Sequence, residues 1–327
     1  AETVLLRLLR GAGPAGLAGM PASRACGAAR LCRPLLDLPR ERLHAHALGC
    51  GLQWLEDPSN EDPGFGRNVI RHALMPRIEQ RWPGAAERIV RAASHCAEAE
   101  AVGRERAEED LRACLRHDRL GLECLGIDAW RALPAPRRGP VLRQWFRTRT
   151  GLDLDTGTLR RLRNELIDAA RDRHPEYAIG AWRFRRHAGG VYLGARRDEA
   201  APGTFPIAPG DSLRIPGVGE LRLGGAAREP SSPLPGFRVA FPRPGMRCRL
   251  AGRAAKPLRQ VLAEAGVPAW LRDRVPLLLR GDELLAVAAC GAAEDHAPAQ
   301  EGESLLFCWI PDGAQGEAAP PGVAFLA

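Results

Sequence analysis

The residues best suited to chemistry lie between positions 56 and 83, in EDPSNEDPGFGRNVIRHALMPRIEQRWP. The first half of this stretch cannot form a helix or a central strand, because Pro58 and Pro63 lack backbone donors and bias the residues before them away from the helical region. In the second half, apolar residues recur at helical spacing from Ile70 to Ile78. The sequence therefore predicts a structured loop that brings polar side chains to one place, followed by a helix that anchors it. Loops of this kind often carry function.

The charged residues favour a phosphate-bearing partner without requiring one. Of the 327 residues, 47 are Lys or Arg and 39 are Asp or Glu, which gives a formal charge of +8. Lys256 is the single lysine, so 47 less 1, or 46, are arginines. Guanidinium groups bind phosphate through paired hydrogen bonds. A GC-rich genome that favours arginine codons would, however, produce the same excess with no functional meaning.

The sequence predicts neither a metal site nor a bound dinucleotide. The nine cysteines are Cys26, Cys32, Cys50, Cys96, Cys114, Cys124, Cys248, Cys290 and Cys308. They lack the closely spaced pairs that a zinc site requires, so we predict reduced core thiols. The run GAGPAG fits the pattern G-x-G-x-x-G, but it follows a predicted helix and contains Pro14. We therefore expect a tight loop in place of a dinucleotide fingerprint.

The apolar segments indicate a protein that does not enter a membrane. The run PLLL at Pro276 is far too short to span a bilayer. The chain does not open with a charged segment followed by a long apolar one, as a secretory leader would. We therefore expect a soluble, cytoplasmic protein.

The elements that must position the polar loop are a predicted strand, helix and strand. They lie at 31–36, 39–48 and 52–55 and are typical of the end of an α/β unit with a parallel sheet. Ligands of such sheets bind beyond the strand ends, where the loop follows. A helical pattern is already running at Ala1, without an initiator Met, so we expect a truncated chain.

The rest of the sequence predicts a long helix and two further domains. The alanine-rich stretch after Pro83 interleaves Glu and Arg at helical spacing. Two apolar stripes, at 141–146 and 159–167, predict helices, and two glycines, Gly189 and Gly190, predict the turn of a hairpin. A ribbon, a helix, a hairpin and a final strand follow a linker at 197–209. The expected divisions are 1–84, a linker helix at 85–120, a mainly helical domain at 121–197 and a small α/β domain at 205–327.

Four segments together resemble a known family. They are AETVLLRLLRGAGPAGLAGM, RPLL, EDPSNEDPGFGRNVIRHALMP and KPLRQVLAEAGVPAWLRDRVPLL, and in this order and at these separations they resemble the tRNA(Ile)-lysidine synthetase family. The resemblance runs from Ala1 to Ile310. Its most specific parts are D-x-S-N from Asp57, R-N-x-x-R from Arg67 and GVPAWLRD from Gly266.

The resemblance implies a fold and a reaction. Residues 1–84 would be the remainder of a parallel-sheet ATP-pyrophosphatase domain, Rossmann-like in class. The family activates the C2 carbonyl oxygen of the wobble cytidine of an isoleucine tRNA by attack on the α-phosphate of ATP, and a lysine amine then displaces AMP. The product, lysidine, makes a CAU anticodon read AUA in place of AUG. The implied partners are tRNA(Ile) with a CAU anticodon, L-lysine, ATP and Mg²⁺, the last two as substrates of the intact enzyme.

The resemblance also assigns roles within the loop and its helix. Arg67 and Arg71 would stabilise negative charge on the pyrophosphate leaving group, and Glu2 and Asp57 would attract a lysine ammonium or Mg²⁺. The expected catalytic residues are Glu2, Asp57, Asn60, Arg67 and Arg71, with Ser59 and Asn68 shaping the loop. Structural alternatives remain open.

Those alternatives assign the same residues to local structure. Asp57 and Ser59 suit an Asx turn, Asn68 suits a helix start, and Arg71 would pair with Glu61 or Asp62.

A second expected site is a tRNA-binding surface on the two later domains. Phosphate contact needs positive charge along one face, and each residue has the alternative of being an ordinary solvated side chain. The candidates are Arg160, Arg161, Arg163, Lys256, Arg259, Arg272 and Arg274.

The sequence departs from the family in one respect that bears on activity. The Ser-Gly-Gly-x-Asp-Ser loop of the family does not occur in these 327 residues, nor does the His- and Asp-rich segment ahead of AET. No other Gly-rich segment between a strand and a helix could cradle phosphates, so we predict that the isolated chain does not hydrolyse ATP. The alternatives are a tRNA-binding chain without catalysis, or another tRNA-modifying ATP pyrophosphatase. A thiolating enzyme of that kind would need cysteine pairs, which the sequence lacks.

Overall fold

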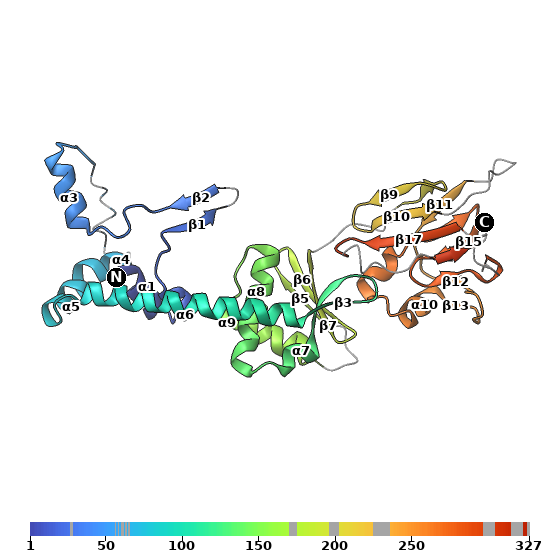
Figure 1. Cartoon of the computed structure of the whole chain (residues 1–327), viewed down its shortest axis with the longest axis horizontal. Helices are drawn as coiled ribbons and strands as arrows, with labels where there is room; N and C mark the ends of the chain where they lie inside the picture. Colours follow the sequence, from blue (N-terminus) through green and yellow to red (C-terminus); the bar gives the residue numbers. More distant parts are fainter. Residues whose placement is uncertain are drawn as a thin grey trace. The chain divides into compact units, whose positions relative to one another are not determined.

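The computed structural model describes residues 1–26, 29–55, 57, 59, 62, 64, 66–169, 175–195, 203–224, 236–296, 305–314 and 323–325. The chain divides into two units, Ala1–Ala107 and Glu108–Ala327 (Figure 1). Each unit has its own packing. Among the described residues, no helix is long and apolar enough to cross a membrane.

The first unit is mainly helical. Its elements are α1 (Glu2–Leu9), α2 (Pro14–Leu17), β1 (Ser23–Cys26), β2 (Ala29–Cys32), α3 (Arg40–Gly49), α4 (Gly66–Val69), the π-helical segment η2 (Ile70–Leu74), α5 (Met75–Arg81) and α6 (Ala85–Cys114), which continues into the second unit. The helix predicted after the polar loop is confirmed as the continuous run α4, η2 and α5. The helix at Ala1 is confirmed, and GAGPAG follows α1 with Gly11 at a φ of 75°. The alanine-rich helix predicted at 85–120 is confirmed as far as Cys114, but it ends there because residues 115–117 form a strand.

The strands predicted around α3 are wrong. The structure places β2 at Ala29–Cys32, where it pairs antiparallel with β1, and all four of its residues are exposed. Residues 52–55 form no strand, and Leu52 and Leu55 are 59% and 100% exposed. A short apolar run without an adjacent core does not specify a strand. The predicted helix between them is confirmed as α3.

The first half of the second unit packs helices on one face of a sheet. Its elements are β3 (Leu115–His117), β4 (Glu123–Gly126), α7 (Ile127–Ala132), α8 (Ala135–Thr150), α9 (Thr156–Arg161), the π-helical η3 (Leu162–Ile167), β5 (Glu176–Ile179), β6 (Trp182–His187) and β7 (Gly190–Ala195). The antiparallel sheet has the order β3-β4-β7-β6-β5. The predicted helices are confirmed, whereas the sequence did not predict β3, β4 and β5.

The side chains of β6 alternate between the two faces of the sheet. Phe184 is fully buried and packs against Trp145 and Phe146 of α8. Successive side chains of a strand point to opposite faces, so Arg183 and Arg185 lie on the face away from these helices. The β6–β7 turn lies at Ala188 and Gly189, whose φ values of 44° and 72° are both positive, one residue earlier than predicted.

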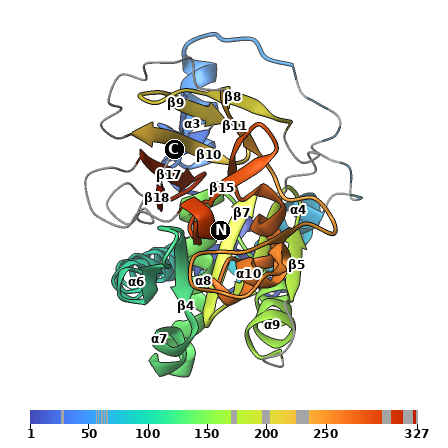
Figure 2. The same ribbon diagram turned by 90° about the vertical axis from the view of Figure 1, so that its right-hand side faces the viewer.

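The second half of this unit is rich in sheet. Its elements are β8 (Phe205–Ile207), β9 (Ser212–Ile215), β10 (Gly219–Gly224), β11 (Phe237–Ala240), β12 (Arg247–Cys248), β13 (Lys256–Pro257), α10 (Leu258–Glu264), the 3-10 helix η4 (Ala269–Arg274), β14 (Leu277–Arg280), β15 (Glu283–Val287), β16 (Gly291–Ala292), the 3-10 helix η5 (Glu294–His296), β17 (Leu305–Pro311) and β18 (Val323–Phe325). The sheets have the orders β18-β17-β10-β9, β16-β15-β14-β11-β8 and β12-β13. Figures 1 and 2 both label β9, β10 and β17 of the first sheet and β11 and β15 of the second. The predicted ribbon, helix, hairpin and final strand are confirmed, whereas β8 lies within the linker predicted at 197–209 and pairs with β11.

The nine cysteines are all free, but they are not all core residues. Cys114, Cys124 and Cys248 are buried as predicted, where burial raises the pKa of each thiol. Cys26, Cys32 and Cys50 are exposed, in contrast to the prediction. These three lie in the first unit, where α1, α2, β2 and α3 contain no buried residue.

Candidate functional site

The structure brings three of the predicted catalytic side chains together. Arg71, on η2, donates from Nε to Oε1 of Glu2 at 2.6 Å and from Nη2 to Oε2 at 2.9 Å. Arg67 lies one turn earlier, with its Nε 3.8 Å from Oε2 of Glu2, and donates from Nη2 to Oγ1 of Thr3 at 2.7 Å. Arg71 therefore pairs with Glu2, at the start of α1. Of the two alternative partners, Asp62 accepts from the backbone N–H of Gly64, and Glu61 lies outside the described residues.

The charges of this cluster reinforce one another. Burial alone would raise the pKa of Glu2, but the hydrogen bonds and charge of Arg71, with the charge of Arg67, outweigh it and lower that pKa. The hydrogen bonds to Glu2 also raise the pKa of Arg71. One carboxylate thus faces two guanidinium groups, and the excess positive charge suits an anionic ligand.

We expect this pair to make the first unit sensitive to acid. The folded-state pKa of Glu2 lies below its ordinary value of 4.5, so the pair stabilises the unit fully above that pH and progressively less as the pH falls through the lowered pKa. In Arg71→Ala, burial acts on Glu2 without those hydrogen bonds, so its pKa should rise. An NMR titration of the Glu2 carboxyl would measure this. An unchanged pKa in the variant, relative to an Arg77→Ala control, would contradict the role given to Arg71.

The polar loop is held by Asn68. Its Nδ2 donates to the carbonyl oxygens of Ser59 and Asp62, both at 2.9 Å, and the residue is only 6% exposed. Asp57 accepts from the backbone N–H of Ser59 at 2.9 Å, an Asx turn that lowers the pKa of Asp57. The loop-shaping roles of Ser59 and Asn68 stay predictions, and Asn60 lies outside the described residues.

Replacing Asn68 by alanine should loosen this loop. Two carbonyl oxygens would lose their amide donor, at an expected loss of about 1–3 kcal/mol in the free energy of unfolding of the first unit. Limited proteolysis should then cut the chain between positions 55 and 66 faster than in the parent. Asn164→Ala, at an exposed position, is the matched control and should leave the cleavage rate unchanged. Equal cleavage of both variants would contradict the holding role of Asn68.

The predicted tRNA-binding residues fall into two groups. Arg160, Arg161 and Arg163 are exposed on α9 and η3. The others contact neighbours within the C-terminal half: Lys256 with Glu264, Arg259 with Asp273, Arg272 with the carbonyl of Val267 and Arg274 with the carbonyl of Gly217. Burial lowers the pKa of Arg272, in keeping with its structural contact. The tRNA-binding role of all seven remains a prediction.

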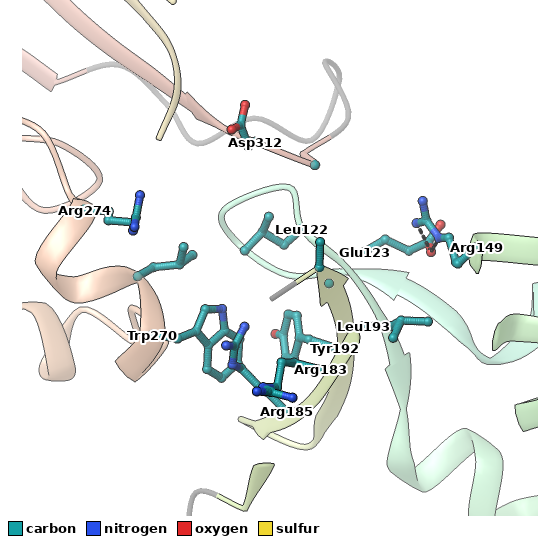
Figure 3. A pocket seen from close by; sticks show the side chains of 14 residues that line it. Leu122, Glu123, Arg149, Arg183, Arg185, Tyr192, Leu193, Trp270, Arg274 and Asp312 are labelled. Atoms are coloured by element: carbon teal, nitrogen blue, oxygen red, sulfur yellow. Dashed lines mark hydrogen bonds and ion pairs between the residues drawn. The ribbon is translucent and has the colours of Figure 1, made fainter. Parts of the chain in front are cut away.

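The second unit contains a cavity that sequence reasoning missed. Its volume is about 230 Å³, and Figure 3 shows side chains from both halves of the unit around it. Its polar and aromatic lining residues include Glu123, Arg149, Arg183, Arg185, Tyr192, Trp270, Arg274 and Asp312. Of these, only Arg274 was predicted to bind a ligand. Two other lining residues, Arg183 and Arg185, lie in the run WRFRR on either side of Phe184. This alternation indicates a strand with both arginines on one face, which could have pointed to the site.

Comparisons with known proteins agree with these features. A family model described as a PP-loop domain matches residues 1–78, which contain the Glu2 cluster. A model described as the TilS substrate binding domain matches residues 125–192, and one described as the TilS substrate C-terminal domain matches residues 237–309. These matches support the predicted ATP-pyrophosphatase class for the first segment, followed by two substrate domains.

Several curated relatives share most of the chain. A tRNA(Ile)-lysidine synthase of Pseudomonas aeruginosa is 43% identical over 88% of this chain and 65% of its own length. One of Pseudomonas putida is 41% identical over 88% of this chain and 67% of its own, and one of Escherichia coli O157:H7 is 32% identical over 94% and 71%. The chain belongs to the tRNA(Ile)-lysidine synthase family. It spans about two thirds of the length of the synthases it matches, as the 65% and 66% covered in the first two relatives show.

The Glu2 cluster and the cavity lie in segments that match different domains of the synthase family. The Glu2 cluster lies in the segment that matches the PP-loop domain. The cavity is lined by residues of the two segments that match the substrate domains, 125–192 and 237–309, and by residues next to these segments. The described residues contain no group of three or more His, Cys, Asp or Glu that could hold a metal ion.

Proposed function

We propose that the chain contributes to ATP-dependent ligation of lysine to C2 of the wobble cytidine of tRNA(Ile) with a CAU anticodon. The reaction would run through an adenylated tRNA and change codon reading from AUG to AUA, in the cytoplasm. The observation that carries this proposal is the Glu2, Arg67 and Arg71 cluster within the segment similar to a PP-loop domain. The names of the relatives support the same reaction.

The cluster supplies the charges that the two half-reactions need. Adenylation releases pyrophosphate, and Arg67 and Arg71 would stabilise its negative charge. Arg71 also holds both oxygens of Glu2, so the carboxylate is oriented before a substrate arrives. Carboxylate oxygens keep lone pairs beyond these two bonds, and Glu2 would accept from the ammonium of lysine. Asp57 would add a second carboxylate from the loop.

Mg²⁺ would accompany ATP and would not occupy a site built by the protein alone. This ion is usually held by substrate phosphates and one or two carboxylates. Glu2 and Asp57 would fit that limited role, because each supplies one carboxylate. When bound, the ion would neutralise phosphate charge during adenylation.

The chain by itself should not catalyse the reaction. Its 327 residues contain no Ser-Gly-Gly-x-Asp-Ser loop to hold the phosphates of ATP. We therefore expect no ATP hydrolysis by the isolated chain. Measurable AMP release by it would contradict this expectation. A tRNA-binding chain without catalysis is the second candidate function.

The deciding experiment measures incorporation of labelled lysine into a CAU-anticodon tRNA(Ile) with ATP and Mg²⁺. Three proteins are compared: this chain, the P. aeruginosa relative, and a hybrid in which the part of the relative preceding its match is joined to Ala1. Incorporation by the relative and the hybrid, but not by the chain alone, is the expected result. An inactive hybrid beside an active relative would reject the ligase proposal, and tRNA binding by the chain would then favour the second candidate.

A further inference from the structure

The cavity of the second unit has a polar wall made by neighbouring strands. Arg183 lies opposite Gly194, and Arg185 opposite Tyr192, in the antiparallel register of β6 and β7. Gly194 has no side chain, and a Cβ built there would meet nothing within 4 Å, so the space beside Arg183 is open. The sheet therefore presents two guanidinium groups toward the cavity (Figure 3).

These guanidinium groups are held in place before any ligand arrives. Arg183 and Arg185 share the carboxylate of Glu176, each at 2.8 Å, and their side chains are only 14% and 20% exposed. Arg185 also lies over the ring of Trp270, 5.5 Å from its centroid. Tyr192 contacts the same ring at 5.2 Å and donates its hydroxyl to Asp118 at 3.0 Å. A preorganised guanidinium loses less freedom on binding.

Positive charge exceeds negative charge among the residues that line this cavity. Four arginines line it, Arg149, Arg183, Arg185 and Arg274, against the two carboxylates Glu123 and Asp312. The difference, four less two, is two positive charges in the lining, and the carboxylates of Glu176 and Asp118 contact lining residues from beside it. A partly buried excess of guanidinium charge attracts an anion, and planar guanidinium groups match phosphate oxygens in pairs.

The walls of the cavity come from both halves of the second unit. Arg149, Arg183 and Arg185 belong to the helix and sheet of the first half, whereas Trp270 and Arg274 belong to η4 of the second. The halves also meet where His187 Nε2 lies 3.0 Å from the carbonyl oxygen of Gly266. An occupant would contact both halves and would favour their docked arrangement.

We propose that this cavity binds a phosphate group and that the bound phosphate links the two halves of the second unit. A phosphodiester of RNA and a free phosphate ion share this chemistry. The RNA source rests on the proposed function, in which tRNA is the substrate. The free-ion source does not depend on it.

The test uses the whole chain and the double variant Arg149→Gln with Arg183→Gln. Affinity for the CAU tRNA(Ile) is measured across salt concentrations, and thermal unfolding is measured with sodium phosphate against sodium chloride of equal ionic strength. Loss of two phosphate contacts should weaken tRNA binding about 10-fold or more and lower the slope of log K against log salt by about 1–2. Phosphate should raise the Tm of the parent and not that of the variant.

Two further variants keep the test decisive. Arg222→Gln removes an exposed arginine that pairs with Glu220 on β10, away from the cavity lining, and should behave as the parent. The variant Arg149→Lys with Arg183→Lys keeps both positive charges but loses the planar guanidinium groups, so it should lose part of the tRNA affinity and part of the phosphate-dependent rise in Tm. It replaces the glutamine variant if the glutamine variant does not fold.

Each outcome separates the two sources of phosphate. Weaker tRNA binding in the variant supports the cavity as an RNA site, and loss of the phosphate-dependent Tm rise alone supports a free-ion site. Parental tRNA affinity and salt slope, together with no phosphate effect on the parent, would overturn the proposal while leaving tRNA binding intact. If the parent binds no tRNA, the proposed function fails. The thermal unfolding measurement with sodium phosphate then decides by itself whether the cavity binds phosphate.

Discussion

Replacing Glu2 by glutamine in the hybrid of this chain and its P. aeruginosa relative is expected to lower lysine incorporation at least about 100-fold, the usual effect of removing one oriented electrostatic group from an active site. Glutamine retains the size of Glu2 but not its charge, so it cannot accept both strong bonds from Arg71 and would not hold a lysine ammonium as tightly in the role proposed for Glu2. Arg71→Ala should cause a comparable loss, because it removes a guanidinium and leaves a half-buried Glu2 without its principal partner.

The control for both variants lies on the following helix. Arg77 is an exposed arginine of α5, and Arg77→Ala should retain activity within about 2-fold, as expected for a surface substitution. Separate titrations of lysine and ATP would divide the roles: Glu2→Gln should raise the KM for lysine, whereas Arg71→Ala should lower kcat. Near-parental incorporation by Glu2→Gln would remove Glu2 from the catalytic set without affecting the family assignment.

Replacing Phe184 by alanine should cost about 3–5 kcal/mol of the free energy of unfolding of the second unit, the range for deleting a buried phenylalanine ring. Phe184 is 0% exposed, and its ring centroid lies 5.8 Å from that of Trp145 and 5.7 Å from that of Phe146. The ring closes the contact between β6 and α8, so its loss leaves a cavity that these large neighbours cannot fill by small shifts.

Urea unfolding followed by tryptophan fluorescence would measure this loss, since Trp145 lies against the deleted ring. Leu152→Ala, at a side chain that is 55% exposed, is the matched control and should change stability by no more than about 0.5 kcal/mol. A midpoint for Phe184→Ala equal to that of the control would show that the sheet and α8 do not unfold as one unit. The rise in Tm caused by sodium phosphate should also be smaller in Phe184→Ala, because Phe184 anchors the strand between Arg183 and Arg185.

The sequence alone determined the helices whose apolar residues recur at a helical period and the motifs that place the chain in its family. Val141, Trp145 and Leu162 belong to the two apolar stripes that predict helices, and all three are at most 2% exposed in the structure. Local patterns suffice there, because a helix forms its hydrogen bonds within its own segment. The R-N-x-x-R motif likewise identified Arg67 and Arg71 before their partner was known.

Only the tertiary structure decided which residues meet. Glu2 and Arg71 lie 69 positions apart, and no local sequence pattern predicts the two hydrogen bonds between them. The strands predicted at 31–36 and 52–55 failed for the same reason, since strand pairing depends on a partner and a core elsewhere in the chain. The phosphate cavity is the clearest case. Arg149, Arg183 and Arg274 are ordinary basic residues in sequence, and they become a candidate site only because folding places them around one space whose charge is unbalanced.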